Sequence, residues 1–209
     1  MTLGSRTALV NGRAVTMSVA PQARSGRTLV PLRFVAEASG KKVEWSSKAR
    51  MILINDGVYE RINTTLTKND LNRSILDNAR RGYLGPFHYS DITGYSTRPL
   101  GDVVNKFGMP DERYNGTDAS DDRPFIYYGN YAISIIGTSN THYLKNPRAT
   151  GLSMYFNERL TPQDVTRALG PPDAKEIGMY DYLDYYVGDY VLSVVYYDNS
   201  VYYFELYKR

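Results

Sequence analysis

The chain has 209 residues, of which 42% are hydrophobic and 22% are charged, with a net charge of +3 and no cysteine. This composition is that of an ordinary globular protein, and the length suits two small domains that each bury a core. The lack of cysteine excludes disulfides and thiol chemistry, and no apolar run is long enough to predict a membrane-spanning helix.

Charge and tyrosine are unevenly distributed along the chain. Residues 1–68 hold 11 Lys and Arg against 4 Asp and Glu, whereas residues 69–209 hold 14 against 18. The basic charges are dispersed and form no stripe, so we expect no nucleic-acid partner. All 20 tyrosines lie at position 59 or later, and ten of them fall between Tyr180 and Tyr207. The two parts of the chain are therefore expected to present different surfaces.

The N-terminal residues predict a strand followed by a short helix. Pro31 suits the first helical position, where a missing N–H is not needed, and Gly40 ends the helix. The helix face predicted to pack consists of Leu32, Val35, Ala36 and Ser39.

Together with Val10-Asn11-Gly12, Pro21 and Trp45, this strand and helix resemble the copper amine oxidase N-terminal-like domain over residues 3–55. The resemblance implies a small extracellular stalk module of Gram-positive surface proteins, with a small antiparallel sheet wrapped on one helix. Ser39 stands where that family commonly has Leu, and Ser46 where Asp usually follows the Trp. We expect looser packing at these positions and an unchanged fold.

Copper chemistry does not follow from the resemblance. Copper amine oxidase catalysis needs three His ligands and a Tyr that becomes the quinone, but this chain has only His88 and His142. Tyr131 follows Asn130 as in the quinone motif, but Ala132 replaces the acid that the motif carries. We therefore expect no catalytic copper and no cofactor, with both histidines serving as loop or packing residues.

The first residues, Met1-Thr2-Leu3-Gly4, have neither the basic start nor the apolar core of a signal peptide. The chain is accordingly cytosolic, or a leader has been removed. The resemblance favours removal, and hence an extracellular or cell-surface protein peripheral to the envelope.

A domain boundary is expected in the linker 56–66, between domains at 1–55 and 67–209. Asn55-Asp56-Gly57 forms a turn there, after which the apolar pattern lapses. A helix is then predicted over 67–81, capped by Thr67 with Asp70 three residues later and closed by Gly82. Its predicted apolar stripe consists of Leu71, Ile75, Leu76 and Ala79.

Beyond this helix the sequence repeats itself at an offset of about 60 residues. Asp102-Val103 and Asp164-Val165 each open a short helix that ends at Gly, and a Pro-Asp turn follows. Gly129-Asn130 and Gly188-Asp189 then form hairpin turns. We predict an α+β fold in which each repeat, about 83–157 and 158–209, is a helix followed by a three-stranded antiparallel meander.

These motifs resemble the tandem-repeat superfamily of β-lactamase inhibitory proteins and a small outer-membrane-assembly lipoprotein, and most of all an uncharacterised secreted Gram-positive branch. The resemblance spans about residues 68–209. It implies a curved, Tyr-rich sheet with helices on one face only.

Strand alternation assigns the faces of that sheet. In the last strand Tyr202, Phe204 and Leu206 point inward, which leaves Tyr203 and Glu205 on the other face. The same alternation directs Asp184 outward, between Tyr182 and Tyr186. The outward residues that are candidates for binding a partner are Tyr127, Tyr155, Tyr182, Tyr186, Tyr197, Tyr203, Glu205 and Tyr207. Tyr combined with Ser and acids is typical of protein interfaces, although tyrosines also serve as strand formers on half-buried surfaces.

Three functions remain open at this point. The first is a secreted, non-enzymatic protein whose Tyr face binds a protein partner, with inhibition of an envelope enzyme as its sharpest form. The second is a module that binds carbohydrate or a cell-wall polymer by stacking tyrosines on sugar rings. The third is a hydrolase, for which Asp181 and Asp184 are the paired carboxylates. The acidic loop 115–122 has carboxylates for calcium but lacks the ligand spacing of an EF-hand.

Overall fold

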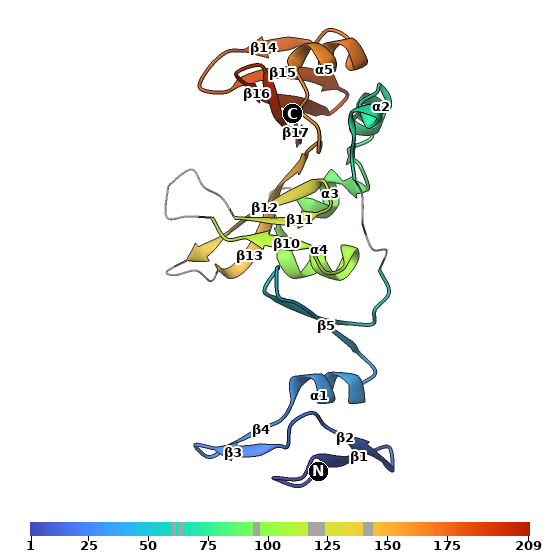
Figure 1. Cartoon of the computed structure of the whole chain (residues 1–209), viewed down its shortest axis with the longest axis vertical. Helices are drawn as coiled ribbons and strands as arrows, with labels where there is room; N and C mark the ends of the chain where they lie inside the picture. The colour runs from blue at the N-terminus through green and yellow to red at the C-terminus, as the bar shows by residue number, and fades with distance from the viewer. Residues whose placement is uncertain (60–61, 63–64, 94–96, 117–123, 140–143) are drawn as a thin grey trace. The chain divides into compact units, whose positions relative to one another are not determined.

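The structure is a computed structural model that describes residues 1–59, 62, 65–93, 97–116, 124–139 and 144–209 (Figure 1). His142 and the part of the acidic loop from residue 117 on lie outside the described residues. The chain divides into two compact units, one made of residues 1–45 and 51–59 and the other of residues 46–50 and 60–209.

The N-terminal unit contains one helix and short β-hairpins. Its elements are β1 (Thr7–Val10), β2 (Arg13–Thr16), β3 (Gln22–Arg24), β4 (Arg27–Leu29), α1 (Leu32–Ala38), β5 (Lys42–Ser46) and β6 (Met51–Asn55). They form three separate two-stranded sheets, β1-β2, β3-β4 and β5-β6, where the sequence predicts one small sheet. Asn11-Gly12 and Ser25-Gly26 have positive φ at both turn positions, which matches the right-handed twist of paired strands and closes each hairpin tightly.

Helix α1 lies where the sequence predicts it, but it buries less than expected. Pro31 precedes the first helical residue instead of occupying it. Ala36 is the one buried residue of the helix, while Leu32 and Val35 are 52% and 47% exposed. A unit of this size with three separate hairpins has too little cover for a full helix face.

The C-terminal unit opens with short elements. They are the 3₁₀ helix η1 (Lys68–Asp70), α2 (Ser74–Arg80), β7 (Tyr83–Leu84), β8 (Phe87–His88), α3 (Tyr89–Ile92), β9 (Arg98–Pro99) and α4 (Leu100–Phe107). The remaining elements are β10 (Glu112–Tyr114), β11 (Phe125–Tyr128), β12 (Tyr131–Ser139), β13 (Leu144–Met154), α5 (Pro162–Leu169), β14 (Ala174–Glu176), β15 (Asp181–Val187), β16 (Tyr190–Tyr197) and β17 (Ser200–Lys208).

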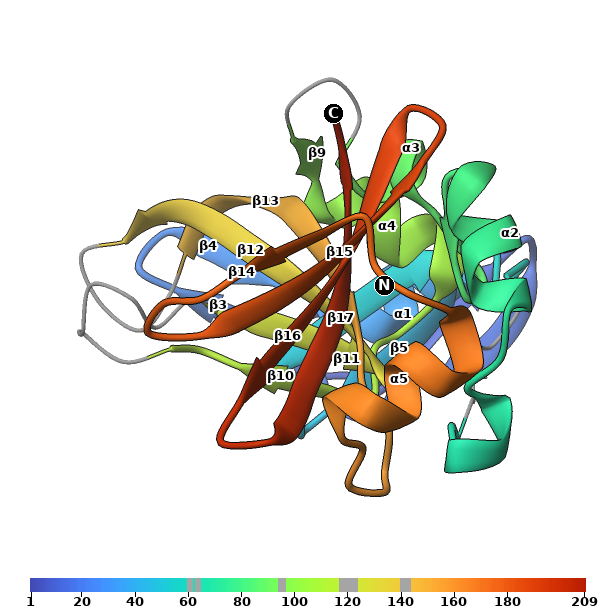
Figure 2. The same ribbon diagram turned by 90° about the horizontal axis from the view of Figure 1, so that it is seen from above.

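A nine-stranded antiparallel sheet dominates this unit. Its strand order is β10-β11-β12-β13-β17-β16-β15-β14, and β9 pairs with β13 off this path. Two groups of strands that are each sequential in the chain thus meet at β13 and β17. Figure 2 shows that β15–β17 run in a different direction from β12 and β13, as the cumulative twist of a long sheet requires.

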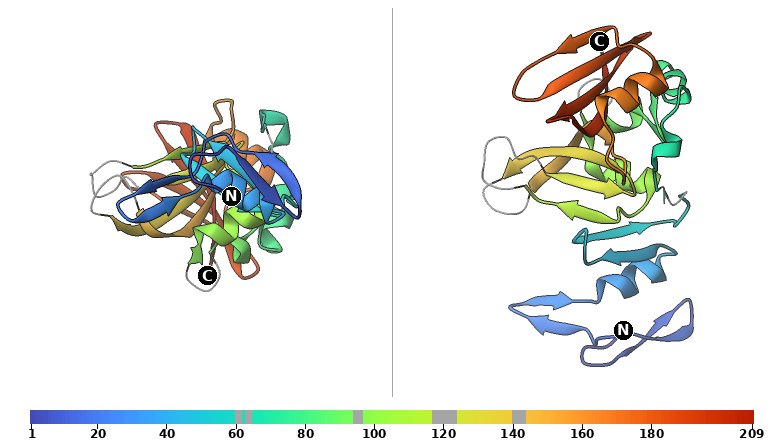
Figure 3. Two further views of the ribbon diagram at one scale, coloured as in Figure 1. Left: turned by 90° about the horizontal axis from the view of Figure 1, so that it is seen from below. Right: turned by 45° about the horizontal axis from the view of Figure 1, so that its top comes forward.

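The predicted helices 102–107 and 164–169 and both predicted hairpins are present. The carbonyl of Gly108, just after α4, accepts a hydrogen bond from the Tyr128 hydroxyl at 2.8 Å. The carbonyl of Gly170, just after α5, accepts one from Tyr185 at 3.1 Å. Figure 3 shows α5 (orange) beside the orange and red strands that it covers. Each helix end is therefore tied to the inner face of the sheet, which is defined here as the face that contacts the helices.

The predicted helix 67–81 is broken into η1 and α2. Leu71 is extended, with φ −76° and ψ 95°. The side chain of Asn72 then accepts a hydrogen bond from the N–H of Ser74 at 3.0 Å, which starts a new helix. Asn competes for backbone donors in this way, so it interrupts a helix that apolar spacing alone would continue.

Tyr202 is a second correction, because half of its surface is exposed where the sequence predicts a core residue. Phe204 and Leu206 of the same strand are buried as predicted. The pairing of β16 with β17 shifts register between Val195 and Tyr196, which leaves Tyr202 without a paired residue on β16. The alternation that buries Phe204 and Leu206 is interrupted at this irregularity, so it does not bury Tyr202.

Candidate partner-binding face

Cross-strand pairing defines a continuous row on the face of the sheet opposite to the helices. We call this face the outer face and this row the central row. From β10 to β14 it consists of Glu112, Tyr127, Ala132, Ser153, Glu205, Ser193, Asp184 and Ala174. Apart from Tyr127, the row contains only small or acidic side chains.

Bulky side chains lie on both sides of the central row. The first tyrosine row consists of Tyr155, Tyr203, Val195, Tyr182 and Glu176. The second tyrosine row has two parts, Tyr114 with Phe125 at one end of the sheet and Tyr207, Val191 and Tyr186 at the other. The outer face therefore alternates between aromatic rows and a polar row that bears carboxylates.

Several members of the central row are buried although no helix covers them by register. Ser153 and Ser193 are each 3% exposed, and Asp184 is 7% exposed. The larger aromatic side chains in the rows on either side shield these small residues from solvent. A Cβ on Gly151 would lie 3.1 Å from Ser134 Oγ and 3.4 Å from Glu205 Oε1, so glycine there lets polar atoms from neighbouring strands approach one another.

The tyrosine hydroxyls of the outer face lie close enough to the carboxylates to feel their charge. Burial raises the pKa of Tyr155, and neighbouring Tyr127, Tyr203 and Glu205 raise it further, against a lowering hydrogen bond with Ser153. The Tyr155 phenol therefore stays protonated at neutral pH and remains a hydrogen-bond donor.

Tyr207 of the second tyrosine row has a similar environment near the other end of the central row. Burial is the largest cause that raises its pKa, and the charges of Asp184 and Glu176 are the next. Hydroxyl donors and carboxylate acceptors are thus interleaved along the face, which suits a partner that offers both polar and cationic groups.

Asp184 stands out among the carboxylates. Its Oδ1 atom is buried and accepts no hydrogen bond from any residue that the structure describes. A buried carboxylate oxygen without a partner carries a desolvation cost with no return inside the protein. A cation is already present nearby on this face, because the guanidinium of Arg209 lies 4.6 Å from the centre of the Tyr186 ring.

The outer face gathers most of the residues that the sequence predicts for partner binding. They are Tyr127, Tyr155, Tyr182, Tyr186, Tyr203, Glu205 and Tyr207. Tyr197 lies apart from them, at the end of the β16–β17 hairpin, where its ring is 6.1 Å from that of Tyr180. Sequence reasoning did not include Asp184 in the site, although alternation placed it outward, because burial and a missing partner leave no signal in a sequence.

The other predicted chemistry does not assemble. Asp181 and Asp184 are separated by three positions in β15 and so point to opposite faces of the sheet. Both ring nitrogens of His88 have partners, the Ser90 hydroxyl at 2.7 Å and the Arg81 carbonyl at 3.1 Å. Within the described residues no group of three His, Cys, Asp or Glu could hold a metal ion. No helix in the described ranges is long and apolar enough to cross a membrane.

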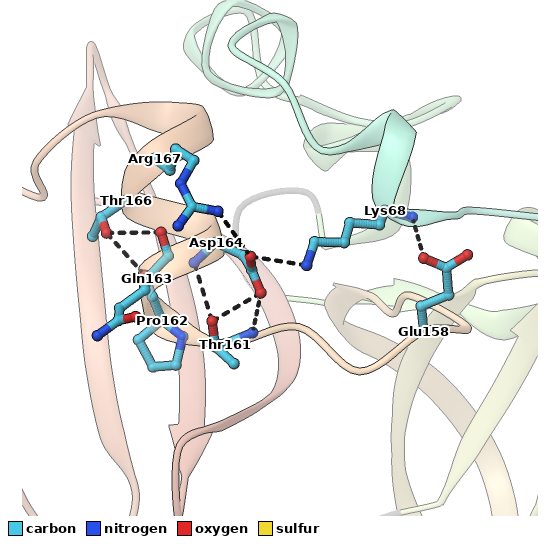
Figure 4. Close-up of polar contacts among 8 residues, drawn as sticks. All are labelled: Lys68, Glu158, Thr161, Pro162, Gln163, Asp164, Thr166 and Arg167. Carbon is cyan, nitrogen blue, oxygen red and sulfur yellow. Dashed lines mark hydrogen bonds and ion pairs between the residues drawn. The ribbon is translucent and has the colours of Figure 1, made fainter.

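A cluster at the start of α5 anchors the segment that leads into the C-terminal unit (Figure 4). Asp164 and Thr161 form a reciprocal capping box, and the ammonium of Lys68 lies 2.9 Å from Asp164 Oδ1. Glu158 accepts a hydrogen bond from the backbone N–H of Lys68 at 3.2 Å. Every carboxylate here already has structural partners, so the cluster serves folding.

A pocket of about 200 Å³ lies elsewhere in the C-terminal unit. Its lining includes Leu66, Asp70, Asn72, Asn78, Tyr131 and Phe156. Burial, followed by the charge of Asp70, raises the pKa of Tyr131 to about 12. The side chains of Asp70, Asn72 and Asn78 already hold neighbouring groups, which leaves few polar atoms to recognise a ligand.

Comparison with known proteins identifies the first segment. Residues 1–54 match the family model of the copper amine oxidase N-terminal domain, which confirms the resemblance predicted for residues 3–55. Among solved structures, the chain is similar to a DUF4309 family protein (YjgB) from Bacillus subtilis subsp. subtilis str. 168. The two are 18% identical, with a TM-score of 0.44 over 68% of this chain and 100% of that chain. No curated protein matches the chain.

Proposed function

We propose that this protein is a non-enzymatic binding protein of the cell envelope whose outer face recognises a protein partner. The observation that carries the proposal is the central row of small and acidic residues between two tyrosine rows. Tyrosine supplies contact area at low entropic cost together with a hydroxyl, and it is enriched where proteins bind one another. Inhibition of an envelope enzyme is the sharpest form of this function.

The arrangement of the sheet supports a tandem-repeat interpretation. Helix α4 and strands β10–β13 form one half of the sheet, and helix α5 and strands β14–β17 form the other half. A helix followed by four strands therefore occurs twice. Both halves contribute to the outer face, so a partner of ordinary interface size would touch residues from each. Resemblance to inhibitory proteins built from such repeats is part of the same proposal.

An extracellular location is supported by the N-terminal domain match alone. Stalk modules of that family hold other domains at the surface of Gram-positive cells. A chain peripheral to the envelope would present the outer face to proteins there.

A glycan ligand is the second candidate, and one contact favours it. The rings of Tyr155 and Tyr203 lie 5.8 Å apart on the outer face, and Glu205 lies in the adjacent row. Aromatic rings can stack on a sugar while carboxylates accept from its hydroxyls. Such a ligand would need one or two rings, whereas a protein partner would need residues from both halves of the sheet.

Capture from an envelope extract, beside a glycan array, tests the proposal. Wild-type protein is compared with Tyr186→Ala/Tyr207→Ala, two residues that are 44% and 39% exposed on the outer face. Tyr83→Ala is the matched control, because Tyr83 is 40% exposed on β7, outside the large sheet. A protein retained by wild type and the control but not by the double variant supports the proposal. A protein retained equally by all three, or glycan binding alone, contradicts it.

A further inference from the structure

The outer face carries acids and few bases, and strand alternation is the cause. On β14, Glu176 faces outward while Lys175 pairs with inward Leu183. On β10, Glu112 faces outward while Arg113 pairs with inward Ile126. The same alternation places Asp184 and Glu205 outward and Lys208, the partner of Tyr190, inward. The face is therefore acidic, although the whole chain has a net charge of +3.

Asp184 gives this acidic face a specific position that favours a cation. Its side chain projects to the outer face by register, and it is 7% exposed with Oδ1 unpartnered among the described residues. A carboxylate oxygen in that condition gains most from a charge-assisted hydrogen bond to a cation. Its cross-strand neighbours Ser193 and Ala174 have small side chains, and neither brings a positive charge to it.

The cation that fits is a guanidinium. Arg209 already places one 4.6 Å from the centre of the Tyr186 ring, so this aromatic row accepts a planar cation. Guanidinium pairs with a carboxylate through two parallel N–H donors and lies flat on rings, whereas an ammonium is a compact point charge without this planar geometry. Tyr207 is 39% exposed, and it lies close enough to Asp184 for the charge of that carboxylate to raise its pKa, so an accessible ring is present near the carboxylate.

We propose that the outer face binds an arginine-bearing basic segment of its protein partner, with a guanidinium paired to Asp184 and stacked against Tyr207. This inference rests on the proposed function and names the chemistry of the partner. Electrostatic attraction to the acidic face would also speed association and weaken it at high salt.

Isothermal titration of the full chain with two peptides tests the proposal. One is Ac-Gly-Arg-Gly-Arg-Gly-amide, and the other has citrulline, the neutral isostere of arginine, in place of both arginines. We expect the arginine peptide to bind at least about tenfold more tightly. Asp184→Asn should weaken the arginine peptide about tenfold and leave the citrulline peptide unchanged.

Asp198→Asn is the matched control, because it removes the same charge from the β16–β17 turn. Asp198 has φ +47°, a conformation that asparagine also tolerates. Equal loss of binding in the two variants, or equal affinity for the two peptides, would overturn the proposal. The thermal midpoint of Asp184→Asn should equal or exceed that of wild type, because a buried unpaired charge is removed, and a lower midpoint would count against the environment assigned to Asp184.

The outcome also separates this inference from the function on which it rests. A protein partner that needs Tyr186 and Tyr207 but binds Asp184→Asn as well as wild type would leave the proposed function standing and refute this inference. If the arginine peptide binds through Asp184 but no captured protein depends on Tyr186 and Tyr207, this inference stands and the proposed function is refuted.

Discussion

At the residue scale, Phe204 and Tyr202 are two positions apart in β17 but have different surroundings. Phe204 is fully buried and its ring lies 5.3 Å from that of Phe156. Tyr202 is 50% exposed and its ring contacts that of Tyr180 at 5.8 Å. Two residues that alternation assigns to the same face therefore differ in burial, because the pairing of β16 and β17 shifts register at Tyr202.

This difference predicts unequal costs for the two substitutions. Phe204→Ala should lower the free energy of unfolding by about 3–5 kcal/mol, because it opens a cavity. Tyr202→Ala should lower it by about 1 kcal/mol or less. Urea denaturation of both variants measures this, and a Tyr202→Ala cost equal to that of Phe204→Ala would refute the register shift.

Asn130 is a second residue whose role is visible only in three dimensions. Its Oδ1 accepts a hydrogen bond from the N–H of Leu66 at 2.9 Å, and its Nδ2 donates to the Tyr155 carbonyl at 2.9 Å and to Asn157 Oδ1 at 2.8 Å. Asn130 is 8% exposed. One side chain in the β11–β12 turn thus joins the end of the linker to the segment that follows β13.

Asn130→Ala should therefore destabilise the C-terminal unit by about 2–3 kcal/mol, because it leaves a buried N–H and a carbonyl without partners. Asn157→Ala is the control, since it removes one of these bonds at an exposed site and should cost about 0.5–1 kcal/mol. Chemical denaturation followed by tyrosine fluorescence measures both. Similar costs for the two variants would show that Asn130 does not hold the linker.

The sequence predicted that the side chain of Asp184 points outward, but not that it is buried with an unpartnered oxygen. Alternation in β15 places an acid outward, where solvent is the ordinary surrounding of a carboxylate. Burial arises because the neighbouring Ser193 is small and aromatic side chains from other strands stand beside it. Those strands are distant in sequence, so no local pattern reports their proximity.

At the element scale, the capping box of α5 holds its helix and also receives Lys68 from η1. The hydrogen bond from Lys68 is the largest cause that lowers the pKa of Asp164, followed by the backbone N–H and the hydroxyl of Thr161. The folded state therefore favours the ionised form. Its contribution to stability is present above the ordinary pKa of an aspartate, about 3.9, and is lost as the pH falls below that value.

Asp164→Asn should accordingly unfold at lower urea concentration than wild type at pH 7, and the gap should narrow as the pH is lowered from about 4 to 2. Asp77→Asn is the control, because Asp77 is exposed and, among the described residues, its ion pair is with Arg80 of the same helix α2. Urea midpoints measured across this pH range test the sign. A gap that widens on acidification would contradict the lowered pKa.

Elements with strong local signals were predictable, and short ones were not. Helices α4 and α5 end before the predicted Gly, but each begins two residues before the predicted Asp-Val, which therefore lies in the first turn. These signals act within one helical turn, so they predict the helices and their ends well. Edge strands β10 and β14 have three residues each, too few for alternation to show in the sequence. The break between η1 and α2 depends on the side chain of Asn72, which outweighs apolar spacing.

At the scale of the whole molecule, the two units differ in how much core they contain. Buried apolar residues of the N-terminal unit are few: Ala8, Met17, Ala36 and Leu53. Leu9, Trp45 and Val58 are 70%, 58% and 86% exposed. The C-terminal unit buries side chains along the whole inner face of its large sheet, so most of the stability should reside there.

Limited proteolysis with chymotrypsin should therefore cut first after Tyr59, within the predicted linker. A fragment of residues 60–209 should unfold cooperatively near the thermal midpoint of the full chain, whereas residues 1–59 alone should melt without a sharp transition. Differential scanning calorimetry of the three proteins compares them. A fragment 60–209 that fails to fold would contradict a domain boundary in the linker 56–66.

The measurement that tests the account most directly is site-specific photo-crosslinking from the two faces of one sheet. Benzoylphenylalanine is placed at Tyr186, on the outer face, and at Lys175, whose partner Leu183 lies on the inner face. Both sites are exposed and lie on neighbouring strands, so they differ mainly in direction. After irradiation in an envelope extract, we expect a discrete protein adduct from position 186 and none from position 175. The same adduct from both positions, or from position 175 alone, would contradict it.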